Sequence, residues 1–218
     1  MTSLPRPTLI TGITPRGYLR GGVSHFRRYQ EAFIARHGSG LTGRVVEIGG
    51  ELHYNNARFF PNAIAFVCTN IARDFDVYLD VTTMPYPDES QDAYLCASVL
   101  NHVYNIQGAV SEMRRTLKPG GVLLIVMPFG CPVCDVVDHW RLTAMAYAEL
   151  LEGFRVEEFT HLGGRFSTIV NSLQRPKGNL SMRHLPSKLI GLVLTLIARP
   201  LDRIDDFPLG FGIRATKV

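Results

Sequence analysis

The candidate side chains for catalytic proton transfer lie at two places in the chain. His102 lies in the segment SVLNHV, and Asp138, His139, Trp140 and Arg141 follow one another further along. Histidine exchanges protons near neutral pH, so His102 and His139 are candidate catalytic bases. Asp138 could orient a histidine, and Arg141 could hold an anionic group of a substrate. We therefore predict catalysis by His102, His139 and Asp138, and substrate binding by Trp140 and Arg141.

Structural roles compete with these chemical ones. Trp140 is favoured as an anchor of the hydrophobic core, because a large indole is usually buried. Asp138 could cap a helix that is expected to begin near Thr143. The sequence leaves both kinds of role open for Asp138, His139 and Arg141.

The pair Cys131 and Cys134 resembles a metal or redox motif. One Cys-x-x-Cys supplies two ligands, whereas a structural zinc ion needs four, and no second such pair follows in the sequence. We predict a loop with two incidental thiols and no metal site. Cys68 and Cys96 lie in apolar runs, which indicates reduced core thiols and a cytoplasmic location.

The segment GRVVEIGGELHYNN, residues 43–56, begins like a loop that binds a nucleotide-like ligand. An apolar strand runs into Gly49 and Gly50, and glycine lets a backbone approach a ligand closely because it has no Cβ. A further glycine or two would usually follow, but the chain has Glu51 and His53 within the next positions. The sequence thus predicts a ligand loop whose second half has changed.

Strands and helices alternate along the chain, which predicts a doubly wound α/β sheet. Apolar runs predict strands at residues 44–48, 63–68, 77–81, 92–98, 121–128, 154–162 and 210–217. Capping and periodicity predict a helix from Ser24 and helices at residues 55–60, 106–118 and 143–152. Ligands bind beyond the carboxyl ends of such strands, so the residues that follow each strand form the candidate site.

Composition limits the class of protein. The chain has 218 residues, of which 46% are apolar, enough for one hydrophobic core. We expect an N-terminal arm and helix over residues 1–42 and one α/β domain over residues 43–218. The net charge is +4 without a Lys/Arg run, so no nucleic-acid partner is expected. No signal peptide is visible, and no apolar run reaches the roughly 20 residues of an integral membrane segment.

Residues 187–199 contain the apolar run KLIGLVLTLIA, flanked by Lys188 and Arg199. A core helix or a lid over the site is favoured, and a hydrophobic lid implies an apolar or large acceptor. A helix on a membrane or in a subunit interface is the alternative, which makes a homodimer a candidate state.

The segment DVTTMPYPDESQDAYLCASVLNHVYNIQGAVSEMRRTLKPGGVLLIVMPF, residues 80–129, resembles the middle of a class I S-adenosylmethionine-dependent methyltransferase of the type 11 group. Residues 138–158 resemble the DYWRFT segment and following helix and strand of a subgroup that often acts on sugars, lipids or secondary metabolites. The resemblance implies a Rossmann-like, doubly wound, seven-stranded sheet. This sheet would be mostly parallel with an antiparallel C-terminal strand and helices on both faces.

The same resemblance implies residues that bind S-adenosylmethionine. Gly49 would pass close to the methionine part, Asn70 would meet the ribose, and Asp80 and the Val81 backbone would meet the adenine. Asn70 replaces the family's acid and gives weaker bonds to the ribose. Glu51 adds bulk and a negative charge near the cofactor's carboxylate. The predicted set is Glu47, Gly49, Gly50, Glu51, Asn70, Asp80, Val81 and Ser98.

Further roles follow from the positions that match the family. His102 occupies the place of the histidine in the family's EVLEHV segment, where it would either transfer a proton or pack under the cofactor. Phe129 and Cys134 join the predicted substrate-binding residues, because the related subgroup often has histidine where Cys134 falls.

The resemblance implies a methyltransferase that acts on a small-molecule acceptor such as a secondary metabolite, a sugar or a lipid-linked glycan. The altered loop keeps two alternatives open. The same fold could catalyse a cyclisation or dehydration, or it could serve as a non-catalytic partner subunit.

Overall fold

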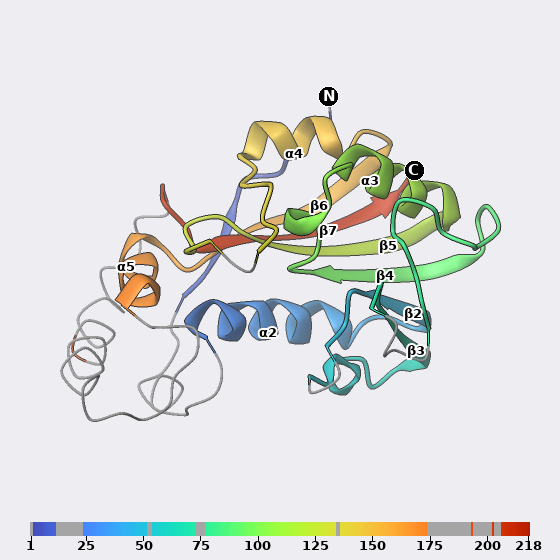
Figure 1. The fold of residues 1–218 in the computed structure, drawn as a ribbon, viewed down its shortest axis with the longest axis horizontal. Helices are drawn as coiled ribbons and strands as arrows, with labels where there is room; N and C mark the ends of the chain where they lie inside the picture. The colour runs from blue at the N-terminus through green and yellow to red at the C-terminus, as the bar shows by residue number, and fades with distance from the viewer. Residues whose placement is uncertain are drawn as a thin grey trace.

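The computed structural model describes residues 2–11, 24–51, 54–72, 77–133, 136–173, 193, 202 and 206–218. These residues form a seven-stranded sheet with helices on both faces (Figure 1). The strand order is β1 (Thr8–Ile10), β6 (Phe154–Leu162), β7 (Gly210–Lys217), β5 (Leu117–Pro128), β4 (Gln91–Ala97), β2 (Gly43–Ile48) and β3 (Ala63–Thr69). Strand β7 is antiparallel to both neighbours, and the other pairs are parallel. The predicted Rossmann-like architecture is confirmed.

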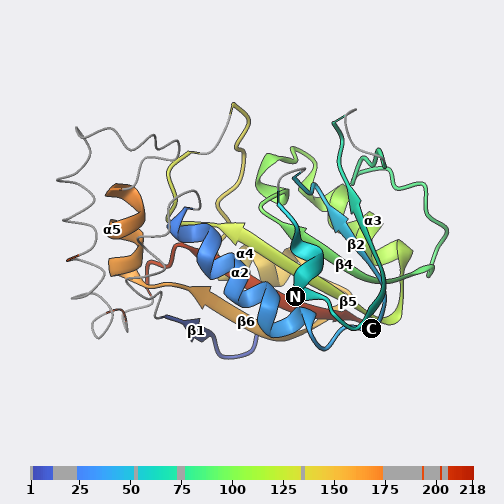
Figure 2. The same ribbon diagram turned by 90° about the horizontal axis from the view of Figure 1, so that it is seen from below.

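Helix α2 (His25–Gly38) covers one face of the sheet, as Figures 1 and 2 show. Its predicted start is confirmed, because the Ser24 hydroxyl oxygen accepts a 3.1 Å hydrogen bond from the backbone N–H of Arg27. Phe26, Tyr29 and Phe33 recur at helical spacing and are buried against the sheet. Burial of this apolar face fixes α2 across the strands.

Helices α3 (Ile106–Thr116) and α4 (Ala144–Leu150) cover the opposite face (Figure 1). The Asn105 side chain caps α3 by accepting from the Gly108 N–H at 3.0 Å, and Thr143 caps α4. Helix α3 ends at Thr116, before the predicted end, because Leu117 already begins β5. The helices on the two faces pack against separate core clusters, as a doubly wound sheet requires.

The predicted strand at residues 77–81 is wrong. Its pairing is limited to one isolated bridge, between Asn70 and Tyr78. The chain turns at once, because the Asp80 carboxylate accepts hydrogen bonds from the Thr82 N–H and hydroxyl at 2.8 and 2.7 Å. The seventh strand is instead β1, from the predicted N-terminal arm, which pairs with β6 through Thr8 and Thr160.

Strand β3 is an edge strand, not the fully buried strand that its apolar sequence predicts. Ile64 is 87% exposed, because no further strand or long helix covers it among the described residues. The connection from β2 to β3 contains the short 3-10 helix η1 (Asn56–Phe59), which agrees with the predicted short helix. The β3 edge of the sheet therefore leaves part of its apolar surface exposed.

Helix α5 (Arg165–Leu173) was not anticipated. The spacing of Phe166, Val170 and Leu173 could have indicated it. The predicted helix at residues 187–199 lies outside the described residues, apart from Val193. Within the part of the chain that is described, none of the helices combines the length and the apolar character needed to cross a bilayer.

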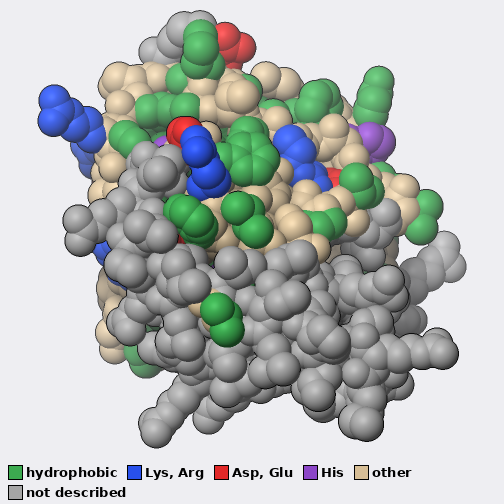
Figure 3. Space-filling view, turned by 90° about the vertical axis from the view of Figure 1, so that its left-hand side faces the viewer, with side chains coloured by type: hydrophobic (Ala, Val, Ile, Leu, Met, Phe, Trp, Pro, Cys, Tyr) green, Lys and Arg blue, Asp and Glu red, His purple; other side chains and the backbone are tan. Residues whose placement is uncertain are grey.

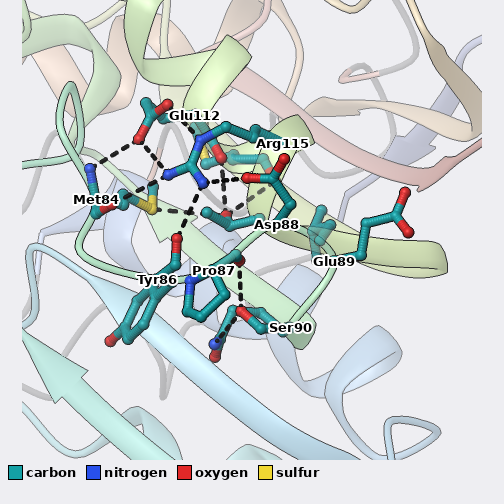
Figure 4. A network of polar contacts seen from close by, with 12 residues as sticks. Met84, Tyr86, Pro87, Asp88, Glu89, Ser90, Glu112 and Arg115 are labelled. Carbon is teal, nitrogen blue, oxygen red and sulfur yellow. Dashed lines mark hydrogen bonds and ion pairs between the residues drawn. The ribbon is translucent and has the colours of Figure 1, made fainter.

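Arg115 of α3 holds the loop that precedes β4 (Figure 4). Its guanidinium donates hydrogen bonds to the carbonyls of Met84 and Tyr86, at 3.1 and 3.0 Å, and to the Asp88 carboxylate at 2.6 Å. Glu112 accepts from the Met84 N–H at 2.9 Å and from the same guanidinium. The PxPDxSxD run that carries the family resemblance thus has a structural role.

Burial of His25 predicts a specific pH dependence of stability. This ring lies edge-on to Tyr29 at the start of α2, with its centroid 5.4 Å away, and burial lowers its pKa from 6.5 to about 4 against the opposing effect of Asp202. Below pH 6.5 the unfolded chain takes up a proton that the folded chain does not. Stability is therefore full above that pH and falls as the pH drops toward 4.

The native chain should lose unfolding free energy between pH 7 and pH 5. We expect His25→Phe to lose about 2 kcal/mol less over the same interval. Urea denaturation at both pH values measures it. His139→Phe, at an exposed ring, is the matched control and should keep the native dependence. An unchanged slope in His25→Phe would contradict the assignment.

Candidate functional site

The carboxyl ends of β2, β3, β4 and β5 meet at one edge of the sheet, near the amino end of α2 (Figures 1 and 2). The parallel register pairs Ile48 with both Thr69 and Cys96, and Ala97 with Val126. The residues that follow these strands are therefore neighbours. They are Gly49, Asn70, Ser98 and Phe129. The structure brings together at this edge the predicted positions that follow four different strands.

Gly49 and Gly50 are required by packing within the protein. Gly49 has φ +68°, and a Cβ there would lie 2.4 Å from Cγ2 of Val99. A Cβ at Gly50 would lie 2.1 Å from Sγ of Cys68. The Gly50 N–H also donates to the Thr69 carbonyl at 3.0 Å. The sequence suggested that the glycines let the backbone come close to a ligand. In the structure they also let it come close to the ends of the neighbouring strands.

Glu47 lies buried beneath this loop. Its carboxylate accepts a hydrogen bond from the Asn56 side chain of η1. Burial raises the pKa of Glu47, with hydrogen bonds from Asn56 and Cys68 opposing the shift. Burial, together with the neighbouring Glu47, raises the pKa of Cys68 to about 12. These polar groups hold the loop from below, and Asn56 is a participant that gave no signal in the sequence.

Glu51 lies on the surface, with its side chain 59% exposed, and forms an ion pair with Arg27 of α2. The Arg27 guanidinium lies 4.4 Å from the ring centroid of Tyr54, which sits one turn after the loop. The negative charge that was expected to repel a cofactor carboxylate is therefore paired with a cation. His53 lies outside the described residues.

The Asn70 side chain ties two strand ends together. Its Nδ2 donates to the Gly50 carbonyl at 2.7 Å, and its Oδ1 accepts from the Ala72 N–H at 2.9 Å. Asp80 holds the next turn through Thr82, and Val81 is buried in the core. The three positions predicted to meet ribose and adenine therefore also fix the backbone at this edge.

Ser98 has φ +59°, an uncommon conformation for a residue with a side chain. Its hydroxyl donates to Oε1 of Gln30 at 2.8 Å, and its N–H donates to the Val126 carbonyl at 2.8 Å. Gln30 is fully buried on α2 and was missed by the sequence analysis. A polar residue among the apolar positions of that helix face was the available signal.

A second network joins the 3-10 helix η2 (Leu100–His102), which follows β4, to the loop after β5. The Nδ1–H of His102 donates to the Val137 carbonyl, and Nε2 accepts from the Asn101 amide at 3.1 Å, a tautomer assigned from these partners. The same amide donates to Asp138 at 3.1 Å, and Arg141 makes a forked ion pair with Asp138. The structure thus connects two predicted catalytic residues through Asn101, which the sequence did not indicate.

The other residues of this loop have distinct surroundings. His139 is exposed beside Tyr104, with ring centroids 5.5 Å apart, and its N–H donates to the Asn101 carbonyl at 2.7 Å. The Trp140 indole is half-buried and donates to the Val103 carbonyl at 2.9 Å. The suggested capping of α4 by Asp138 is wrong, because Thr143 caps that helix and Asp138 binds Arg141.

Phe129 begins the loop after β5 and packs between two rings. Its centroid lies 5.9 Å from that of Phe207 and 5.3 Å from that of Phe211. Cys134 lies outside the described residues, and the Cys131 thiol donates to the Leu209 carbonyl. Among the residues that the structure describes, no cluster of three or more metal-ligating side chains occurs.

The fold and this edge define a Rossmann-like α/β protein with a candidate ligand site at the carboxyl ends of its strands. A family model described as a methyltransferase domain matches residues 39–125. The chain is 44% identical over 114 residues to a demethylmenaquinone methyltransferase of Tropheryma whipplei (strain Twist), a match that covers 50% of this chain and 41% of the relative. The chain thus spans less than half the length of that curated relative.

Solved structures share the fold. A SAM-dependent methyltransferase from Archaeoglobus fulgidus matches with a TM-score of 0.59 and 18% identity, over 88% of this chain and 94% of that one. The cyclase SpnF matches with a TM-score of 0.57 and 17% identity, over 86% of this chain and 79% of that one. Residues 39–125 thus match the methyltransferase domain model, in agreement with the sequence resemblance, and the solved structures share the Rossmann-like fold.

The packing of the glycine loop makes a prediction about stability. Gly49 and Gly120 both have positive φ, but a Cβ at Gly120 would meet no atom within 4 Å. Gly120→Ala should lower the unfolding free energy by about 1 kcal/mol through backbone strain alone. Gly49→Ala adds the clash with Val99 and should cost about 2 to 4 kcal/mol.

Urea denaturation of both variants measures the difference. Val99→Ala in the Gly49→Ala background should recover part of the lost stability, because it removes the clashing methyl groups. Equal losses in the two alanine variants would show that the loop has room for a side chain.

Proposed function

We propose that the protein transfers a methyl group from S-adenosylmethionine to a small-molecule acceptor such as a secondary metabolite, a sugar or a lipid-linked glycan. The observation that carries the proposal is the meeting of Gly49, Gly50, Asn70 and Ser98 at one edge of a methyltransferase-type sheet. The predicted cofactor residues Glu47, Gly49, Gly50, Glu51, Asn70, Asp80, Val81 and Ser98 border that edge. The free thiols of Cys68, which is half-buried, and Cys96, which is buried, support a cytoplasmic location.

In this proposal the glycine loop receives the methionine part of the cofactor, and Arg27 offsets the charge of Glu51 toward the cofactor's carboxylate. The Asp80 turn receives the adenine. Both hydrogen bonds from Thr82 go to Oδ1 of the Asp80 carboxylate, so Oδ2 can accept a hydrogen bond from the adenine. Bound S-adenosylmethionine would supply an activated methyl group. The protein then needs only to align the acceptor and help remove its proton.

For proton removal we propose His139, whose ring is exposed on the loop after β5, where acceptors are expected to bind. His102 and Asp138 hold this loop in place through Asn101 and Arg141. Trp140, Phe129 and Cys134 remain the proposed substrate-binding residues. Both ring nitrogens of His102 have hydrogen-bond partners within the protein, which favours a positioning role for this ring.

A second candidate function is a reaction without methyl transfer on the same fold, such as a cyclisation or dehydration. The side chain of Asn70 favours it, because both of its polar ends already have partners within the protein. The shared fold with SpnF is compatible with this candidate. Production of S-adenosylhomocysteine distinguishes the two functions, because the second involves no methyl transfer and could keep the cofactor as a structural part.

We expect calorimetry to show micromolar binding of S-adenosylmethionine and S-adenosylhomocysteine. Glu51→Gly should tighten it several-fold, because it removes both bulk and a like charge. Glu51→Gln is the matched control that removes the charge alone. Arg27→Gln should weaken binding by about tenfold, because it leaves Glu51 unpaired. No heat with either ligand would remove the methyltransferase proposal and favour the second candidate.

We expect His139→Gln to lower turnover by about 100-fold without changing S-adenosylhomocysteine affinity. Release of S-adenosylhomocysteine measures turnover, with demethylmenaquinone as the first acceptor because of the named relative. His102→Gln is the comparison variant, and its larger effect should be a lower melting temperature. Full activity in His139→Gln combined with loss of activity in His102→Gln would contradict this assignment and indicate His102 as the base.

A further inference from the structure

Gln30 of α2 is a buried amide with incomplete hydrogen bonding. The residue is 0% exposed, and its Oε1 accepts a 2.8 Å hydrogen bond from the Ser98 hydroxyl, an orientation of the amide assigned from this bond. Its Nε2 carries two N–H donors and has no hydrogen-bond partner among the residues that the structure describes. Since a buried donor without a partner destabilises a fold, this nitrogen indicates a partner that the described chain does not supply.

The Gln30 amide lies between the ends of two neighbouring strands. Ser98, to which it is bonded, directly follows β4. Arg27 lies one helical turn before Gln30 and pairs with Glu51 in the loop after β2. Strands β2 and β4 are adjacent in the sheet, so one side of α2 contacts both strand ends. Figure 3 looks onto this edge of the sheet, where Lys and Arg side chains lie among hydrophobic ones on the described part of the surface.

The residues around the amide leave the edge open to a ligand. Gly49 and Ser98 are half-buried, whereas Gln30 lies fully buried beneath Ser98. The unpaired nitrogen belongs to the same amide group as the oxygen that bonds Ser98, so it lies beside that hydroxyl. An amide N–H pairs with an oxygen acceptor and forms its strongest bonds with an anionic one. The position and chemistry of Nε2 therefore suit a carboxylate that lies over Gly49 and Ser98.

We propose that Nε2 of Gln30 donates a hydrogen bond to the carboxylate of the methionine part of the cofactor. The inference rests on the proposed function, which places that part at the glycine loop. Arg27 offsets the charge of Glu51 there, and Gln30 supplies a direct hydrogen bond from the next turn of the same helix. Gln30 is thus a specificity-determining residue that recognises the amino-acid part of the cofactor and not its adenosine.

Calorimetry with two ligands tests the proposal. S-adenosylhomocysteine carries the amino-acid part, whereas methylthioadenosine has the thioether and the adenosine without it. Gln30→Met keeps the length of the side chain and removes the N–H donors. It should weaken S-adenosylhomocysteine binding about tenfold and leave the affinity for methylthioadenosine unchanged. A merely structural role of Gln30 would change both affinities alike.

Gln91→Met is the matched control. Gln91 is also a buried glutamine whose amide bonds a serine hydroxyl, that of Ser90 at 3.0 Å, but it lies at the amino end of β4. This variant should bind both ligands as the native chain does. Thermal unfolding shows whether each variant is folded. Gln30→Asn, which keeps an amide but shortens its reach, takes the place of Gln30→Met if the latter does not fold.

The outcomes separate this inference from the proposed function. If the native chain gives no heat with S-adenosylhomocysteine, the proposed function fails and the assignment of Gln30 fails with it. If the native chain binds S-adenosylhomocysteine and the folded Gln30 variant binds it equally well, only the assignment of Gln30 is overturned. An equal loss of both ligands in that variant also overturns it, and leaves Gln30 as a structural partner of Ser98.

Discussion

The carboxyl edge of the sheet depends on the lack of space around Gly49 and Gly50. A methyl group at either position would overlap a side chain at the end of a neighbouring strand, Val99 after β4 or Cys68 in β3. Asn70 adds a hydrogen bond to the Gly50 carbonyl from the end of β3. Three strand ends are thereby held at close range, and the positions of Gly49, Gly50 and Asn70 follow from that contact.

The segment between β2 and β4 has little regular structure of its own. Its described residues contain a short 3-10 helix, one edge strand and two isolated bridges. In place of a third internal strand, Arg115 and Glu112 hold the loop at residues 84–90 through its backbone. The turn at Asp80, which precedes this loop, is positioned from α3, because Leu79 and Val81 pack in the same core cluster as Val110 and Met113 of that helix. A substitution in α3 that breaks these contacts should therefore shift the backbone at the proposed adenine site.

The sequence predicted those features that depend on local spacing. The apolar period of α2, the cap at Ser24 and the runs in β2 and β4 each arise from neighbours within a few positions. It failed where partners are distant. Residues 77–81 read as a strand because Leu79 and Val81 are apolar, but these side chains enter the core from a turn.

The same limit explains the candidate site. The positions after the strands were predictable, because parallel strands place their carboxyl ends together. The partners of these side chains were not predictable. Gln30, Asn56 and Asn101 come into contact with the candidate site residues only when the chain folds. Glu51 is an example. Its charge looked unfavourable until the structure placed Arg27, 24 positions earlier in the chain, beside it.

The two histidines show why residue type is a weaker guide than environment. A general base needs a free lone pair that the acceptor's proton can reach. In His102 one ring nitrogen donates to a backbone carbonyl and the other accepts from Asn101. The lone pair of the second nitrogen is therefore free only when its hydrogen bond with Asn101 is broken. His139 projects from the same network, held by its backbone N–H while its ring remains exposed. The arrangement uses one histidine to fix the loop and leaves the other available for chemistry at its tip.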